Sequence, residues 1–248
     1  MAKEYALKKD KEAENTVGSG FILNILTWIL YSLISALIMS AYMKSMASDP
    51  ETLGDGITYG LITSVGSLFI FLEANFSRAH QARGNTIQPT LSQSIGALTN
   101  IILDPILIFG VGFIPSLGVA GASIATVIGQ FVVFLISLYK GFRKPPKFKE
   151  MGYYFKNILF YGYSAGIQQI LFSFYITVLN FILAKFGENA ITVLGLYYKL
   201  QSFFFIPIFG LTTAIIPFLS YNFSKNEDRR CEQMMNYTWL ISGVLMSI

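Results

Sequence analysis

The chain has 248 residues, of which 53% are hydrophobic and only 13% are charged, and its formal net charge is +4. A typical soluble domain carries about 25% charged residues, so this composition excludes a soluble globular protein. Its single cysteine and single histidine exclude a disulfide framework, cysteine-rich zinc motifs and histidine-based metal sites. The sequence therefore predicts an all-α membrane protein, a bundle of several helices that cross the bilayer.

Long stretches without Asp, Glu, Lys or Arg indicate the membrane-spanning segments. About 20 apolar residues cross a bilayer as a helix. The longest uncharged stretch, 105–139, contains a Gly- and Pro-rich turn at 110–118. Seven helices are expected, at about 20–44, 56–78, 89–110, 118–139, 157–184, 190–221 and 232–248. The charged residues that precede the first of them are typical of a loop between two helices, which indicates a fragment of a longer protein.

Basic residues are concentrated in alternate loops. One set of loops holds 15 of the 18 Lys and Arg residues: Lys3, Lys8, Lys9, Lys11, Arg78, Arg83, Lys140, Arg143, Lys144, Lys147, Lys149, Lys156, Lys225, Arg229 and Arg230. The positive-inside rule places this side, with residue 1, in the cytoplasm, in a multi-pass protein of the plasma (cytoplasmic) membrane. Orientation explains the basic loops, so nucleic acid is not an expected partner, whereas membrane lipid is.

The longest basic linker, 140–156, predicts a division of the chain into two parts. The first, 1–139, holds an entry loop and four helices. The second, 157–248, holds two complete helices and one shorter one. Pro145 and Pro146 stiffen the linker between them.

The third predicted helix contains TNIILDPILIF, which places polar groups inside the membrane. Asn100 and Asp104 are four residues apart and share one helix face. Pro105 cannot donate to the carbonyl of Ile101, and Thr126 of the next, antiparallel helix is expected at a similar depth. Oxygen ligands of these kinds suit a small cation such as Na⁺, or a proton. The alternative is that these side chains only bond to neighbouring helices or, for Thr126, to its own helix.

Other polar residues in the predicted helices are candidates for a substrate cavity. Lys199 lies too deep in the sixth helix to be a simple interface anchor. Glu73 of the second helix is expected either to pair with Arg78 or Arg83, or to relay protons. The remaining candidates, all on the fifth helix, are Gln168, Gln169 and Asn180.

Prolines and small residues indicate bending and close packing. Pro105, Pro207 and Pro217 are expected to kink their helices and are candidates for gating. Gly121, Ala125 and Gly129 repeat small residues every four positions, which predicts a face that packs against a neighbouring helix. His80 and Cys231 are expected in cytoplasmic loops and receive no role.

The motif NIILDP, followed by GVAGASIATVIGQ, resembles the multidrug and toxic compound extrusion (MATE) family. Further similar segments are ARGN at 82–85, FIPIFGLTTAIIPFLSYN at 205–222 and the entry sequence KKDKEAENTVGSG. The resemblance implies part of a twelve-helix fold with two six-helix lobes. This chain would hold helices three to nine, and its partners would include the missing helices.

The resemblance also implies an activity. Such a protein is not an enzyme. It would be an antiporter that exports organic, cationic or amphipathic compounds by alternating access in exchange for Na⁺ or H⁺, with no other cofactor. In some branches of the family the cation site uses an Asn and an Asp of helix five and a Thr of helix six, which match Asn100, Asp104 and Thr126. The helix-one Asp of that site lies outside this sequence, and Phe223 and Ser224 stand where a small Gly-Ala pair is common.

Other functions fit the sequence less well. A flippase for lipid-linked saccharides would need a strongly cationic cavity, and only Lys199 is deep in a predicted helix. A seven-helix receptor would need the opposite orientation. An intramembrane protease would need a second intramembrane aspartate or a Ser–His pair. A membrane fragment without transport activity remains an alternative.

Overall fold

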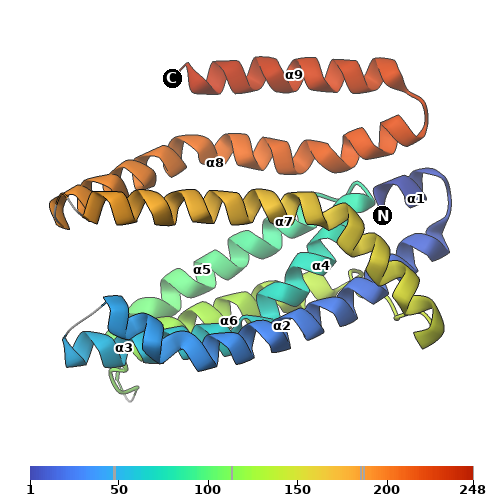
Figure 1. The fold of residues 1–248 in the computed structure, drawn as a ribbon. Helices are drawn as coiled ribbons and strands as arrows, with labels where there is room; N and C mark the ends of the chain where they lie inside the picture. Colours follow the sequence, from blue (N-terminus) through green and yellow to red (C-terminus); the bar gives the residue numbers. More distant parts are fainter. Residues whose placement is uncertain (47–48, 113, 185, 187, 248) are drawn as a thin grey trace. The chain divides into compact units, whose positions relative to one another are not determined.

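The protein is described by a computed structural model that covers residues 1–46, 49–112, 114–184, 186 and 188–247 (Figure 1). This part of the chain is almost entirely helical, with one isolated β-bridge between Val111 and Ile114. The helices are α1 (Ala2–Ala6), α2 (Asp10–Met46), α3 (Pro50–Gly66), α4 (Leu68–Ala82), α5 (Ile87–Phe109), α6 (Gly118–Leu138), α7 (Phe148–Ala184), α8 (Glu188–Ser224) and α9 (Asp228–Met246). The prediction of an all-α fold is confirmed.

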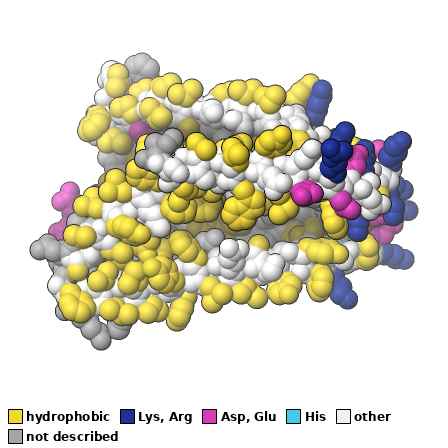
Figure 2. Space-filling view, turned by 90° about the horizontal axis from the view of Figure 1, so that it is seen from above, with side chains coloured by type: hydrophobic (Ala, Val, Ile, Leu, Met, Phe, Trp, Pro, Cys, Tyr) yellow, Lys and Arg dark blue, Asp and Glu magenta, His cyan; other side chains and the backbone are white. Residues whose placement is uncertain are grey.

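All seven predicted segments lie in helices. Within the described residues, five helical stretches are long and apolar enough to cross a membrane: Asp10–Lys44, Pro50–Ala82, Ile87–Phe109, Gly118–Leu138 and Val193–Ser224. Helices α7 and α9 are not among the five. Adjacent glutamines lie in the middle of α7, and α9 has four charged residues among its first five. Hydrophobic side chains cover the lengths of the helices that are visible in Figure 2, as a bilayer requires.

Two helices begin earlier than predicted. Helix α2 begins at Asp10 rather than near residue 20, and α7 begins at Phe148, inside the predicted linker. Acidic residues in their first turns, Asp10 and Glu12 in α2 and Glu150 in α7, interact favourably with the positive end of the helix dipole. The charged segments flanking the apolar runs are therefore helical extensions, which charge-free stretches alone do not reveal.

The predicted span at 56–78 is two helices, with a break at Ser67. The break leaves carbonyl oxygens near the end of α3 without their usual helical partners. Side chains of α2 replace those partners: Ser32 donates to the Ser64 oxygen at 3.0 Å, and Trp28 donates to the Val65 oxygen at 3.0 Å. A Cβ at Gly66 would overlap the side chain of Val127, so glycine permits α6 to approach the break closely. The apolar stretch Pro50–Ala82 is long enough for the predicted span, but the break inside it was not predicted, because it depends on groups from two other helices.

Helix α3 begins at a capped terminus. Asp49 is the N-cap, and its carboxylate accepts hydrogen bonds from the backbone N–H and the hydroxyl of Thr52, both at 2.8 Å. Pro50 occupies the first turn, where its missing N–H costs no hydrogen bond. These hydrogen bonds hold the pKa of the Asp49 carboxyl below its ordinary value.

This lowered pKa predicts a pH-dependent helix start. The hydrogen bonds favour the carboxylate, so the cap is present at neutral pH and is lost as the pH falls through the lowered pKa. We expect the NMR resonance of the Thr52 amide to shift over that acidic range and to stop shifting in Asp49→Asn. The neighbouring Glu51→Gln variant should leave the shift in place. A Thr52 resonance that titrates equally in Asp49→Asn would contradict the cap.

The described chain divides into two compact units. The first contains Met1 and Lys3–Met151, and the second contains Ala2 and the chain from Gly152 onward. In the first unit α6 packs against α3, α4 and α5, and α2 packs against α3 and α4. In the second unit α8 packs against α9. The structure describes each unit by itself.

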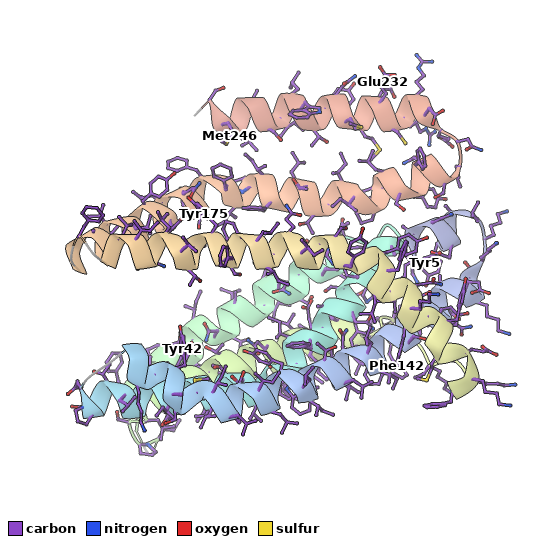
Figure 3. All side chains as sticks on the ribbon, in the orientation of Figure 1. Tyr5, Tyr42, Phe142, Tyr175, Glu232 and Met246 are labelled. Atoms are coloured by element: carbon purple, nitrogen blue, oxygen red, sulfur yellow. The ribbon has the colours of Figure 1, made fainter. Side chains whose placement is uncertain are left out.

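The core of the first unit lies at one end of its helices. We call this the basic end, because it carries Arg78, Arg83 and residues 140–149; the opposite end, with Asp49, Glu51 and Asp55, is the acidic end. An aromatic cluster at the basic end joins α2, α4, α6 and the segment after α6, with ring centroids 5.4 to 6.3 Å apart: Phe21, Phe76, Phe134 and Phe142. In Figure 3 the labelled Tyr5 and Phe142 lie at the basic end, and Tyr42 lies at the acidic end of α2. The aromatic rings of three helices and the following segment thus pack together at the basic end.

Candidate functional site

Asn100 and Asp104 form a polar pair inside α5. The Asn100 side-chain amide donates to the Asp104 carboxylate with an N···O distance of 3.2 Å, and both side chains are half-buried. Asp104 lies five residues before the end of α5, or about 8 Å from the acidic end at 1.5 Å per residue. The helix continues through Pro105, whose nitrogen has no hydrogen to donate to the Ile101 carbonyl. A carboxylate, an amide and a free carbonyl oxygen therefore lie on one turn of a membrane-spanning helix.

Close packing between α5 and α6 fixes the position of this pair. A Cβ at Gly121 would overlap the backbone oxygen of Leu107, and a Cβ at Gly129 would lie 3.0 Å from the Gly96 oxygen and 3.2 Å from the Asn100 Cβ. Gly121, Ala125 and Gly129 are all buried. The predicted small-residue face is confirmed as a packing face, and it brings the α6 backbone against the turns of α5 that carry the polar pair.

Thr126 lies on α6 between the two close-packed glycines. Its hydroxyl donates to the Ala122 carbonyl of its own helix at 3.0 Å. No hydrogen bond between Thr126 and Asp104 is recorded among the described residues. Its hydroxyl oxygen retains a lone pair that can act as a ligand, so its role in a cation site stays a prediction.

Glu73 lies deep in α4 and is 4% exposed. One carboxylate oxygen accepts a hydrogen bond from the Ser77 hydroxyl. The expected ion pair is not formed: Arg78 donates to the Gln81 side chain at 2.9 Å, and Arg83 bonds to Tyr5 and to the Lys140 carbonyl. Both arginines are engaged at the basic end, which leaves the Glu73 charge without a basic partner among the described contacts.

Arg83 has a structural role that the sequence alone did not predict. Its guanidinium donates to the Tyr5 hydroxyl at 3.0 and 2.8 Å and to the Lys140 carbonyl at 3.0 Å. One side chain thus joins α1, α4 and the end of α6. Gln88 adds hydrogen bonds to the Ile136 and Tyr139 carbonyls at 3.0 and 2.9 Å, which satisfies oxygens at the end of α6. The sequence signal that could have indicated this role was the ARGN segment at 82–85, which contains Arg83.

Two expected loop residues lie in helices instead. His80 is in α4, is 3% exposed, and its Nε2 lies 3.2 Å from the Ser137 carbonyl oxygen. Cys231 is in α9, half-buried, with its sulfur 3.9 Å from the Leu219 carbonyl oxygen. The loop prediction is wrong for both, because α4 and α9 extend beyond the apolar runs from which the spans were predicted.

A hollow of about 570 Å³ opens between α2 and α3 at the acidic end. Its lining combines aromatic rings, thioethers and one carboxylate: Tyr31, Met39, Tyr42, Met43, Asp55 and Tyr59. Pockets of about 300–1,000 Å³ hold drug-sized ligands. Aromatic faces and carboxylates attract organic cations, and methionines adapt to varied apolar shapes.

The other predicted cavity residues lie in the second unit and do not line this hollow. Gln168, Gln169 and Lys199 are exposed, and Asn180 is half-buried. Pro207 and Pro217 lie inside α8, which continues as a helix past both. Their roles in substrate binding and gating stay predictions.

The arrangement defines a multi-pass helical membrane protein with polar groups inside its spans. The MatE family model matches residues 1–106 and 165–248, and the chain therefore belongs to the MATE family. Proteins of this family are transporters rather than enzymes.

Relatives and solved structures agree with this placement. The chain is 25% identical to the probable multidrug resistance protein YoeA of Bacillus subtilis, over 99% of this chain and 56% of YoeA. It is 30% identical to the multidrug export protein MepA of Staphylococcus aureus, over 80% of this chain and 43% of MepA. It is 24% identical to an FAD transporter of Shewanella oneidensis, over 85% of this chain and 49% of that protein. The chain thus spans about half the length of the curated relatives that it matches.

The fold is also shared with solved transporters. A MOP superfamily transporter from Pyrococcus furiosus superimposes with a TM-score of 0.86 at 21% identity, over 98% of this chain and 55% of that chain. A multidrug resistance MATE transporter in an outward-facing conformation gives a TM-score of 0.83 at 21% identity, also over 98% and 55%.

Proposed function

We propose that the chain works as part of a cation-coupled antiporter that exports organic compounds by alternating access. The observation that carries this proposal is the hydrogen-bonded Asn100–Asp104 pair within a membrane-spanning helix. An ionisable group in lipid is costly, and such groups usually serve ion pathways or substrate binding. Na⁺ or H⁺ is the coupling ion that oxygen ligands of this kind suit.

Organic cations are the substrate class that the chemistry favours. The hollow near Asp55 has the size of a drug-sized site and an acidic, aromatic lining. YoeA and MepA are named for multidrug resistance and multidrug export, which supports the same substrate class for this chain. A flippase for anionic lipid-linked saccharides would be supported by a basic lining, and the hollow has no Lys or Arg among its lining residues within the described chain.

The orientation follows from the charges. The basic end of the first unit faces the cytoplasm by the positive-inside rule, and residue 1 lies on that side of the plasma membrane. Asp104 is then in the half of the membrane nearer the outside, where an external Na⁺ or proton reaches it first. A ligand shifts such a transporter between its states only as far as its affinity differs between them, so exchange requires the cation at Asp104 and the compound in the hollow to favour different states.

A transport assay tests the proposal. The gene that carries this sequence is expressed in a drug-sensitive bacterial host, and retention of a fluorescent organic cation is followed in cells with an imposed inward Na⁺ or H⁺ gradient. We expect retention to fall when one of the gradients is present and to recover when an ionophore for that ion collapses it. Retention equal to that of vector-only cells under both gradients would overturn the proposal.

A further inference from the structure

A small cavity lies between α4, α5 and α6 of the first unit, away from the Asn100–Asp104 pair. Its volume is about 30 Å³, and it is lined by Ile70, Glu73, Gln93, Gln130 and Val133. A water molecule occupies about 30 Å³ in the liquid, so the cavity has room for one water or one small ion. Gln93 and Asp104 are eleven residues apart on α5, or about 16 Å along the helix. The two polar groups are therefore separate sites.

The cavity lies deep in the membrane-spanning part of the first unit. Glu73 is nine residues from the basic end of α4, and Gln130 is eight residues from the basic end of α6, or about 14 and 12 Å. Gln93 is six residues from the same end of α5, or about 9 Å. Three neighbouring helices thus bring polar side chains to a similar depth, beyond the reach of the basic loops.

Two acceptor groups at the cavity have few hydrogen-bond donors among the described contacts. Glu73 is 4% exposed, and the Ser77 hydroxyl is its recorded donor. The side-chain oxygen of Gln130 is buried and has no hydrogen-bond partner. Leaving such acceptors unsatisfied destabilises the folded state, and more so for a charged group. A donor or a cation between Glu73 and Gln130 removes this destabilisation.

Within the described residues, no helix that packs against α4 carries a basic side chain at the depth of Glu73. Helix α6 has no charged residue, α5 has only Asp104, and α2 is uncharged from 15 to 43. On α4 itself, Arg78 and Arg83 bond to other groups at the basic end, and His80 lies beside the Ser137 carbonyl. Among the described contacts, the Glu73 carboxylate therefore has no basic side chain that would balance a negative charge.

We propose that Glu73, Gln130 and Gln93 form a second cation site, which binds one Na⁺ or one proton. As a sodium site, the Glu73 carboxylate supplies the charge, and the Gln130 and Gln93 amide oxygens supply further ligands of the kind that hard cations prefer. As a proton site, the proton binds to a Glu73 oxygen, and the resulting O–H donates to the Gln130 oxygen directly or through one water. Both species neutralise the same carboxylate and satisfy the same amide.

Ligand-dependent stability tests this site without any transport measurement. The protein encoded by the gene that carries this sequence is purified in detergent as the Asp104→Asn variant, so that the α5 pair cannot contribute. Its thermal unfolding midpoint is measured at increasing NaCl concentrations, with choline chloride replacing NaCl so that the ionic strength stays constant. The midpoint is then measured separately as a function of pH in the absence of Na⁺. A ligand that binds the folded state raises this midpoint as its concentration rises. We expect a rise with Na⁺ if sodium occupies the site, or towards low pH if the proton does.

Substitutions then show whether Glu73 and Gln130 cause this rise of the thermal midpoint. The double variant with Asp104→Asn and Glu73→Gln should lose the ligand-dependent rise of the midpoint. The control double variant with Asp104→Asn and Glu51→Gln, which removes an exposed carboxylate instead, should keep this rise. Asp104→Asn with Gln130→Leu should need more Na⁺, or a lower pH, for the same rise. No response in the single variant, or an equal response after Glu73→Gln, would overturn the site. If Glu73→Gln does not fold, an unchanged response in the Gln130→Leu variant overturns it instead.

Discussion

Cation-driven export is expected to fall to the vector background when Asp104 is replaced by Asn. The substitution keeps the shape of the side chain and can preserve a hydrogen bond with Asn100, but it removes the negative charge. A neutral amide cannot exchange a proton, and it offers Na⁺ only a dipole where the carboxylate offers a full charge. The coupling ion then no longer distinguishes the two states of the transporter, so its gradient cannot drive export.

The measurement is the gradient-dependent retention of the organic cation, together with the amount of protein in the membrane. Membrane levels of Asp104→Asn should match those of the parent, because replacing a charge by an amide lowers the cost of inserting the helix. Glu51→Gln is the matched control, since it removes an exposed carboxylate at the same end of the first unit and should leave export unchanged. Normal export by Asp104→Asn would refute the role of this carboxylate.

Charge spacing and composition predicted the apolar parts of the long helices. In membrane proteins the absence of charge over about 20 residues is imposed by the bilayer itself, so it is visible in a single sequence. The break at Ser67 was not predictable in this way, because it depends on donors from Trp28 and Ser32 and on the space beside Gly66. The first part of α2, from Asp10 to about residue 20, was not predicted as helix, because charged residues are equally compatible with helix and loop.

The candidate site shows the same division between local and tertiary information. The four-residue spacing of Asn100 and Asp104 predicted that they share a face, and the structure shows their hydrogen bond. The buried and unpartnered side-chain oxygen of Gln130 could not be predicted, because it depends on how α4, α5 and α6 pack together. The expected pairing of Glu73 with an arginine was wrong for a related reason, since Arg83 finds a closer acceptor in Tyr5. When a side chain has several possible partners, the sequence alone does not show which of them it binds.

Close packing at Gly121 is expected to be essential for the stability of the first unit. An added methyl group in Gly121→Ala would overlap the Leu107 backbone oxygen, and neither this oxygen nor the α6 backbone can move aside alone. Overpacking of this kind typically costs about 1–3 kcal/mol. For a chain of this size we expect the thermal midpoint in detergent to fall by about 2–4 °C for each kcal/mol lost. Leu107 follows Asp104 by three residues on α5. A shift of α5 away from α6 would therefore also move Asn100 and Asp104.

A graded series of glycine substitutions separates packing from helix propensity. Gly54→Ala adds the same methyl group where nothing lies within 4 Å, so it should be neutral or slightly stabilising. Gly129→Ala would place its methyl carbon 3.0 Å from the Gly96 oxygen and 3.2 Å from the Asn100 Cβ, a tight contact that small shifts relieve, so its cost should be intermediate. The expected order of thermal midpoints is Gly54→Ala, then Gly129→Ala, then Gly121→Ala. Equal midpoints for Gly54→Ala and Gly121→Ala would show that α5 and α6 do not approach as closely as the structure indicates, and the position of Asp104 beside α6 would then lose its support.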